Sequence, residues 1–229
     1  MFSYYFDPTY VLVIIAFLLT LFASMGVKST FSKYNDVRSS RGITAASAAR
    51  QILDANGLQN IRIEHVSGDL TDHYSPNENV IRLSDSTYNS TSVAAIGVAA
   101  HECGHAVQHQ VGYVPIKIRN GIVPIVNVCN TLSMPIFIIG LILGLGRLAM
   151  VGAILFDAVL VFQLVTLPTE INASRRAMKT LESMYLLEGD ELTGARKTLT
   201  AAAMTYVAAV ASTALQFLRL VLLANRRRD

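Results

Sequence analysis

Charged residues are scarce in this chain of 229 residues. Asp, Glu, Lys and Arg together make up 15% of it, and hydrophobic residues make up 52%. Typical soluble domains carry about 25% charged residues. Because the mean hydropathy is also positive, the composition argues against an ordinary soluble protein and predicts a membrane protein. Internal repeats and low-complexity segments are lacking as well, so neither offers a clue to function.

The first apolar stretch, residues 9–27, lacks the flanks of a secretory signal. No Lys or Arg precedes it and no convincing cleavage site follows it. We therefore interpret it as a membrane anchor. A membrane-spanning helix needs about 20 apolar residues. Three further stretches are long enough: 122–145, 147–167 and 199–223. The last of these, the fourth in the chain, is rich in Ala and Thr and is the weakest candidate.

Positive charges predict how these stretches are oriented. Lys28, Lys33, Arg38 and Arg41 follow the first stretch directly, so the positive-inside rule places residue 28 onward in the cytosol. One observation conflicts, because the basic tail 226–228 would lie outside if the fourth stretch spans. Either the internal charges outweigh that tail, or the stretch lies partly in the interface. The internal cations are Lys117, Arg119, Arg175, Arg176, Lys179, Arg196 and Lys197.

The formal net charge of +3 does not indicate nucleic acid. The cations gather at the predicted membrane boundaries, where anionic lipid headgroups are the expected partner. Cysteine is rare, with Cys103 in a predicted helix and Cys129 in a membrane stretch. A cytosolic site is reducing, so we expect no disulfide. We interpret Cys103 as a small buried residue, with oxidation sensitivity or a fourth ligand role as the alternatives.

One motif carries the chemistry. Residues 91–110 have a Ser/Thr start signal and no proline, which predicts a helix. Within it, His101 and His105 are four residues apart and share one face, so both imidazoles can bind one zinc ion. Glu102 leaves the same face beside the metal and is placed to take a proton from water. Gly104 between the histidines suggests a close approach of backbone. The alternative is a surface helix with scattered histidines.

Catalytic zinc sites usually have a third protein ligand. The best candidate is Glu170, because Pro168 suits the start of a helix and Glu170 then falls in its first turn. His109 continues the histidine face but lies about 12 Å along the helix from His101, too far to share its ion. Three other acidic residues look like ordinary surface groups: Glu182, Glu188 and Glu191.

Six segments of the chain form a longer pattern: FDPTYVL, VKSTFSKY, RGITAASAARQILDANGL, LTDHYSPNENVIRLS, AAHECGHAVQH and LVTLPTEINASRRA. Through these segments the chain resembles, nearly end to end, the YugP-type neutral zinc metallopeptidases of bacterial membranes. The family is similar in site layout to the integral-membrane gluzincins typified by the heat-shock peptidase HtpX. In these, H-E-x-x-H and a later E-x-x-x-D are separated by a membrane hairpin.

The resemblance implies roles for particular residues. Glu170 matches the glutamate of the HtpX-type E-x-x-x-D motif, but Ser174 stands where that motif has aspartate. The sequence therefore does not identify the residue that orients His101, and Asn172 and Ser174 are both candidates. Because His105 and Glu170 must meet, the chain has to cross the membrane an even number of times between them. The hairpin 122–167, turning near 144–147, satisfies that condition.

A small α+β module is predicted before the active helix. The pattern indicates a helix over 44–56 that stops at Gly57, a strand over 61–66, and a hairpin that turns at 75–79. By analogy with zincin folds, the strand 81–84 is expected at the sheet edge over the cleft, where a peptide could add to it. Oxyanion stabilisation is unassigned, and the weak candidates are His73, Tyr74, Tyr113 and Tyr206.

We therefore expect a mainly α, α+β membrane protein with a small zincin-like module, and a multi-pass bacterial membrane endopeptidase whose site faces the cytosol. One zinc ion, a protein or peptide substrate and the lipid bilayer are the expected partners. The competing interpretation is a non-enzymatic scaffold with a structural metal site. The expected segments are an anchor (1–27), the zincin-like module (28–121), a membrane hairpin (122–167), the helix with the third ligand (168–198) and a C-terminal membrane helix with its basic tail (199–229).

Overall fold

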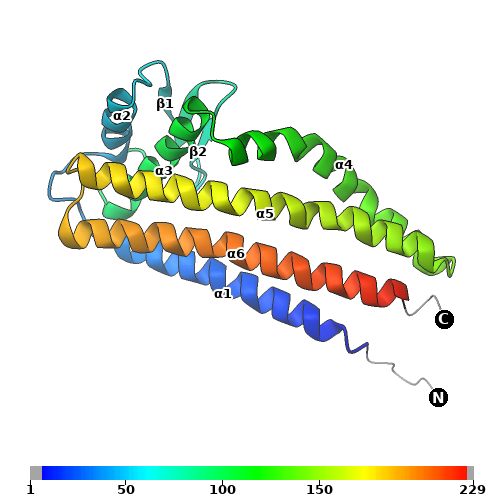
Figure 1. Ribbon diagram of the computed structural model, residues 1–229. Coiled ribbons are helices and arrows are strands. Elements are labelled where there is room, and N and C mark those ends of the chain that lie inside the picture. Colours follow the sequence, from blue (N-terminus) through cyan, green and yellow to red (C-terminus); the bar gives the residue numbers. More distant parts are fainter. Residues whose placement is uncertain (1–6, 226–229) are drawn as a thin grey trace. The chain divides into compact units, whose positions relative to one another are not determined.

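Four long helices contain the apolar stretches of the sequence. In the computed structural model, which describes residues 7–225, they are α1 (Tyr10–Asn35), α4 (Val114–Ile142), α5 (Gly146–Ser183) and α6 (Gly189–Asn225) (Figure 1). Each is long and apolar enough to cross a membrane. The expectation of a mainly α membrane protein is confirmed. α5 and α6 extend beyond their predicted stretches at both ends, whereas α1 does so only at its C-terminal end and α4 only at its N-terminal end.

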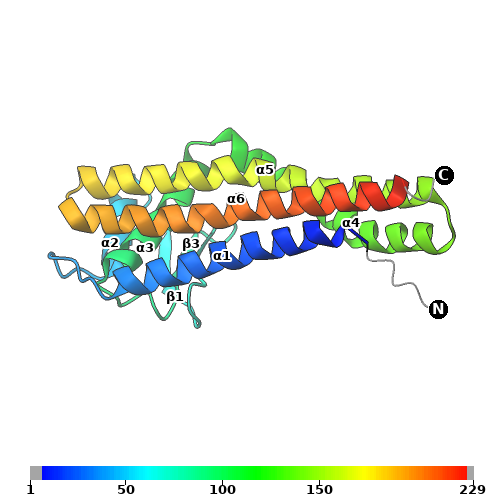
Figure 2. The same cartoon turned by 90° about the horizontal axis from the view of Figure 1, so that it is seen from below.

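The described chain divides into two compact units. The first, the helical unit, comprises residues 7–24, 118–167 and 205–225, and the second, the site unit, comprises residues 25–117 and 168–204. Within the helical unit, α5 and α6 lie side by side in both views (Figures 1 and 2). Their contact includes Ala149, Ala153 and Leu220. The predicted turn of the hairpin is confirmed, because α4 ends at Ile142 and Gly144 adopts a φ of 68°.

Small residues allow close packing in the helical unit. A side chain at Gly152 would collide with the backbone of Phe137, so α4 and α5 touch at this point. Elsewhere in the unit, the Ser212 hydroxyl of α6 donates to the Ala16 carbonyl of α1 at 2.9 Å. Such contacts replace the hydrophobic driving force that helices lack inside lipid.

The site unit is built around two helices that the sequence predicted. In α2 (Ala45–Ala55), the Thr44 side chain caps the Ser47 N–H, and the chain leaves the helix through Gly57 at a φ of 72°. In α3 (Val93–Gln110), Ser92 caps the Ala95 N–H. These side chains satisfy backbone donors that have no partner inside the helix. The two helices pack on each other through a core of Ala, Ile and Leu side chains.

A three-stranded sheet completes the site unit, in the order β1-β3-β2. The strands are β1 (Arg62–His65), β2 (His73–Ser75) and β3 (Val80–Leu83), and β2 and β3 form the predicted hairpin. The expectation that strand 81–84 forms the sheet edge is wrong. The hairpin turn pairs β2 with one side of β3, while β1 pairs in parallel with the other side. β2 therefore occupies an edge and β3 the centre.

The prediction that a helix begins at Pro168 is also wrong, because Pro168 lies inside α5. A proline in a helix removes one backbone hydrogen bond and normally breaks or kinks the helix. Here the turns that follow it are packed, since Thr169, Glu170, Ala173 and Ala177 are all buried. Tertiary packing over these turns outweighs the local preference to stop. Glu170 therefore projects from the middle of a long helix and not from a first turn.

Candidate metal centre

The two histidines of H-E-x-x-H lie one turn apart on α3. Their Nε2 atoms are 3.1 Å apart, and their rings meet edge to face with centroids 4.7 Å apart. The helix is held in place by a buried face that includes Ala99, Cys103 and Ala106. The two histidines lie on another face of the helix, and their four-residue spacing aims both imidazoles at one point. The predicted helix over 91–110 thus places the two residues as the motif requires.

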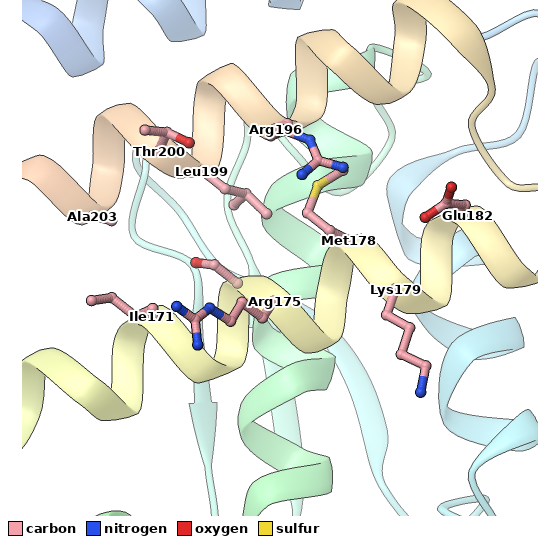
Figure 3. A pocket seen from close by; sticks show the side chains of 10 residues that line it. Ile171, Arg175, Met178, Lys179, Glu182, Arg196, Leu199, Thr200 and Ala203 are labelled. Atoms are coloured by element: carbon pink, nitrogen blue, oxygen red, sulfur yellow. The ribbon is translucent and has the colours of Figure 1, made fainter.

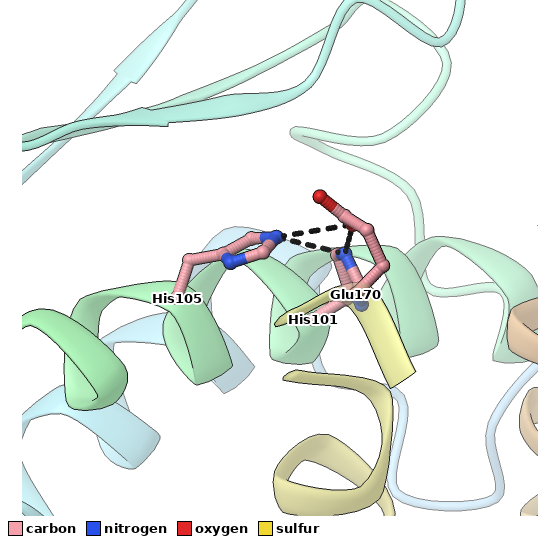
Figure 4. A group of neighbouring side chains, drawn as sticks. All are labelled: His101, His105 and Glu170. Carbon is pink, nitrogen blue, oxygen red and sulfur yellow. Dashed lines mark hydrogen bonds and ion pairs between the residues drawn. The ribbon is translucent and has the colours of Figure 1, made fainter. Parts of the chain in front are cut away.

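The third group comes from α5. The Glu170 Oε2 atom lies 3.3 Å from His101 Nε2 and 3.4 Å from His105 Nε2 (Figure 4). All three side chains are largely buried: His101 is 16% exposed, His105 is 11% exposed and Glu170 is 5% exposed. These three groups lie close enough together to hold a metal ion. The structure thus unites residues 69 positions apart in the sequence.

The triangle of ligand atoms fits zinc. Zinc binds His nitrogen and carboxylate oxygen at about 2.0–2.2 Å in tetrahedral geometry. Two ligands of one such ion are then about 3.3–3.5 Å apart, by the tetrahedral angle. The three distances in this site, 3.1, 3.3 and 3.4 Å, are close to that spacing. Two nitrogens and one oxygen also leave the fourth position open, as in catalytic sites.

Gly104 explains how α3 and α5 come so close. A Cβ atom built at Gly104 would lie 2.6 Å from the Ala173 carbonyl oxygen and 3.2 Å from its Cα. Both residues are buried. Ala173 lies one turn after Glu170, so this backbone contact sets the distance between the histidine face and the carboxylate. The close approach suggested by the sequence is confirmed.

Gln108 orients His105. The Gln108 side chain is fully buried, and its Nε2 donates to the Thr169 carbonyl at 2.8 Å and to Asn172 Oδ1 at 3.0 Å. Both amide hydrogens are therefore used, and Gln108 Oε1 faces His105 Nδ1 at 3.0 Å as an acceptor. Nδ1 must carry the proton, so the Nε2 lone pair of His105 points at the metal position. Such partners fix the tautomer of metal-binding histidines.

Ser174 is the partner of His101. Its Oγ lies 3.1 Å from His101 Nδ1. Asn172, the other candidate, instead accepts from Gln108 and from Arg176 Nε, the latter at 2.8 Å. Ser174 is neutral, so it orients the imidazole without adding the negative charge that an aspartate would supply. Of the two candidates that the sequence offered, the structure therefore places Ser174 next to His101.

The charges of the metal-free site favour a proton on His105. Burial alone would lower the pKa of His105, but hydrogen bonding to Glu170 and the negative charge of Glu102 together raise it above its ordinary value. A zinc ion would replace that proton. Cys103, between the ligands in sequence, lies on the opposite side. Its thiol is fully buried near the Ala49 carbonyl, and burial raises its pKa, so the thiol is inert.

Glu102 is buried at 8% exposure beside the first histidine. It is one of the groups that raise the pKa of His105. It does not belong to the three-residue cluster that could hold a metal ion. A buried carboxylate next to a metal centre, but outside its ligand set, is suited to accept and release a proton.

Other predicted candidates lie in different surroundings. His109 is exposed, and its ring stacks edge-on at 6.2 Å from Tyr74 of β2. Burial raises the pKa of Tyr74, so its hydroxyl remains a hydrogen-bond donor. His73 is exposed, with Nδ1 at 2.9 Å from the Thr71 carbonyl. The Tyr113 ring lies under the Arg176 guanidinium, and Tyr206 belongs to the helical unit.

The acidic residues set aside as surface groups behave differently from one another. Glu182 and Glu188 are exposed, as expected. Glu191 is partly buried, and its carboxylate accepts from the Ser40 N–H at 2.8 Å. Gln108 and its contact with Asn172 were missed. The available signal was a polar residue three positions after His105, on the buried side of an otherwise apolar helix.

Known proteins resemble this chain over nearly its whole length. A family model described as "Putative neutral zinc metallopeptidase" matches residues 9–225. The chain is 44% identical over 218 residues to the "Putative membrane protease YugP" of Bacillus subtilis (strain 168), which covers 95% of this chain and 97% of that relative. No solved structure matches the chain.

Proposed function

Because the chain belongs to the neutral zinc metallopeptidase family, we propose that it is a membrane-anchored endopeptidase with one zinc ion held by His101, His105 and Glu170. The observation that carries the proposal is the triangle of ligand atoms, with sides of 3.1, 3.3 and 3.4 Å. The buried Glu102 beside it supplies the proton-transfer group that hydrolysis requires.

Zinc in such a site polarises a scissile carbonyl and acidifies water. The protein residues do the rest. Gln108 and Ser174 hold the two imidazoles so that each presents Nε2 to the metal position. Glu102 accepts a proton from the attacking water, and the water oxygen bonds to the carbonyl carbon. When the carbon–nitrogen bond breaks, Glu102 returns the proton to the leaving amine.

We propose β2 as the strand that presents the substrate. β2 lies at an edge of the sheet and leans on α3 through Tyr74 and His109. An extended peptide can add to such an edge by backbone hydrogen bonds. This places a peptide along the sheet on the side nearest the active helix. A bond within a chain, and not only a terminal bond, could be presented in that way, which suits an endopeptidase.

We also propose that the site faces the cytosol, because Lys28, Lys33, Arg38 and Arg41 follow α1's apolar stretch. The test uses single cysteines at Ser67 and Ser183, both exposed in the site unit, in a Cys129→Ser background. An impermeant thiol reagent should label neither in intact cells and both after lysis. Labelling of either position from outside the cell contradicts the orientation.

The decisive experiment compares Glu102→Gln with His101→Ala in purified protein. Glu102→Gln keeps the shape of the side chain but cannot accept a proton, so zinc should stay bound while casein or peptide hydrolysis falls by at least about 10²–10⁴-fold. His101→Ala should lose both zinc and hydrolysis, because it removes a ligand. If Glu102→Gln keeps zinc and hydrolyses at the wild-type rate, the peptidase mechanism fails and a scaffold with a structural metal takes its place.

A further inference from the structure

A groove of about 460 Å³ lies between α5 and α6 within the site unit (Figure 3). Its floor is apolar and includes Ile171, Met178 and Leu199, of which Met178 and Leu199 are buried. Two guanidinium groups, Arg175 of α5 and Arg196 of α6, flank it. Figure 3 shows Arg196 reaching across to Met178, whereas the Lys179 side chain extends away from α6. The groove thus combines an apolar floor with a cationic rim.

The cations of the rim have no partner among the residues that the structure describes. Within residues 7–225, neither Arg175 nor Arg196 forms an ion pair or hydrogen bond. Glu182 lines the same groove but pairs with neither of them. Two unpaired guanidinium groups on one groove attract anions, and Arg is well matched to phosphate oxygens because its donors form a planar fork.

The positive surface continues around α6. A second groove, also of about 460 Å³, shares Arg196 with the first and is lined by Lys33 of α1 and Lys197 of α6. Arg196 therefore stands between two grooves, each with further cations. Acidic residues are absent from the lining of the second groove. This charge distribution favours an anionic ligand over a cationic or zwitterionic one.

The groove lies at the ends of two membrane segments. The apolar stretch of α5 ends at residue 167, and Ile171 follows it within about one turn. The apolar stretch of α6 begins at residue 199, and Leu199 belongs to the groove. Basic pockets between helices at this depth meet lipid headgroups. An apolar floor below a cationic rim is complementary to a lipid, which carries its phosphate above acyl chains.

We propose that the groove binds one anionic phospholipid, with its phosphate at Arg175 and Arg196 and its glycerol and upper acyl carbons over Ile171, Met178 and Leu199. Ser174, the partner of His101, also lines the groove. The bound lipid therefore lies one side chain away from the metal centre. The lipid site stands independently of the proposed peptidase activity, because neither Arg175 nor Arg196 forms a hydrogen bond or ion pair with His101, His105 or Glu170.

The test measures lipid binding to the full-length protein by native mass spectrometry in detergent. Wild-type protein should bind phosphatidylglycerol more tightly than phosphatidylcholine. Arg175→Gln and Arg196→Gln should each weaken phosphatidylglycerol binding about fivefold, and together about 30-fold. Their binding of phosphatidylcholine should fall less, because its choline cation offsets the charge of its phosphate. Inorganic phosphate at millimolar concentration should not displace the lipid, because it lacks the apolar part.

The matched control is Lys28→Gln with Lys117→Gln, two exposed cations that also flank membrane stretches but do not line the groove. It removes the same charge and should bind phosphatidylglycerol within about threefold of wild type. Zinc content should be unchanged in every variant, so loss of zinc reports on the metal centre and not on the lipid site. Equal binding of the two lipids, equal binding by the two double variants, or displacement by inorganic phosphate would each overturn the proposal.

Discussion

Replacing Gly104 with Ala sets helix propensity against packing. Gly104 lies inside α3, where Ala is favoured over Gly by about 1 kcal/mol, so propensity alone predicts a more stable protein. The structure predicts the opposite. The new Cβ would lie 2.6 Å from the Ala173 carbonyl oxygen, and its obstacle is backbone that cannot rotate away. Overpacking of this kind costs about 1–3 kcal/mol.

The size of the displacement follows from the contact. An ordinary contact to Cβ begins near 3.4 Å, so α5 must move by about 0.8 Å at Ala173. Glu170, one turn away on the same helix, moves with it, and its present distances of 3.3 and 3.4 Å to the histidines lengthen. Metal–ligand distances tolerate about 0.2 Å. Rotation of the carboxylate recovers part of the loss, so we expect zinc affinity to fall about 10–100-fold.

The assay is zinc affinity by competition with a chelator, together with thermal unfolding of the metal-free protein. Two glycines provide controls. Gly97→Ala is on the same helix, and the nearest atom to its Cβ would be the Ala195 Cβ at 3.3 Å, with the Ala195 backbone no closer than 3.5 Å. Gly121→Ala lies in α4, where a Cβ would meet nothing within 4 Å. Neither control should change zinc affinity by more than about threefold.

The reasoning is refuted by a Gly104→Ala protein with wild-type zinc affinity. It is also refuted if metal-free Gly104→Ala is more stable than the metal-free wild type, because helix propensity would then have outweighed the backbone contact. A loss of affinity in Gly97→Ala as large as that in Gly104→Ala would assign the effect to α3 itself and not to its contact with Ala173.

Three further outcomes are expected. Glu170→Ala should leave the protein folded but nearly free of zinc, whereas Glu182→Ala should keep full zinc content by elemental analysis; equal content in both contradicts the ligand assignment. Gln108→Leu should lower zinc affinity about 10–100-fold in chelator competition, while Gln110→Leu, on the exposed side of α3, should not. Because the raised pKa of His105 lets protons compete from a higher pH than at an ordinary histidine, zinc retention in equilibrium dialysis should fall as the pH is lowered through neutrality; zinc binding that is constant from pH 8 to pH 5 excludes His105 as a ligand.

Local signals predicted the parts of the site that local chemistry determines. Thr44 and Ser92 start α2 and α3, because their hydroxyls accept hydrogen bonds from free N–H groups of the first turn. Spacing on one helix sufficed to put His101 and His105 on a common face. Glu170 was chosen because a third ligand was required, because Pro168 suited a helix start, and because the resemblance matched it. The argument from Pro168 was wrong, since Pro168 lies inside α5, and no local rule joins residues this far apart.

The errors arose where tertiary packing decides. The order of three short strands depends on which side of β3 each neighbour pairs with, and alternation of side chains carries no such information. Pro168 lies inside α5 because the turn that follows it is buried against α3. The rule that proline ends a helix uses the sequence alone and takes no account of such packing. Gln108 looked like any polar residue near a helix end, and only the positions of Thr169 and Asn172 show that its amide is fully used.

The order of the site residues along the chain affects how the protein is made. His101 and His105 leave the ribosome before the apolar stretches of α4 and α5, and Glu170 leaves after them. The triangle of side chains closes only when α5 has been synthesised and the intervening hairpin has returned the chain to the side of α3. A nascent or incompletely inserted chain therefore carries two histidines without their carboxylate. The metal centre can therefore be completed only after the whole of α5 up to Glu170 has been synthesised.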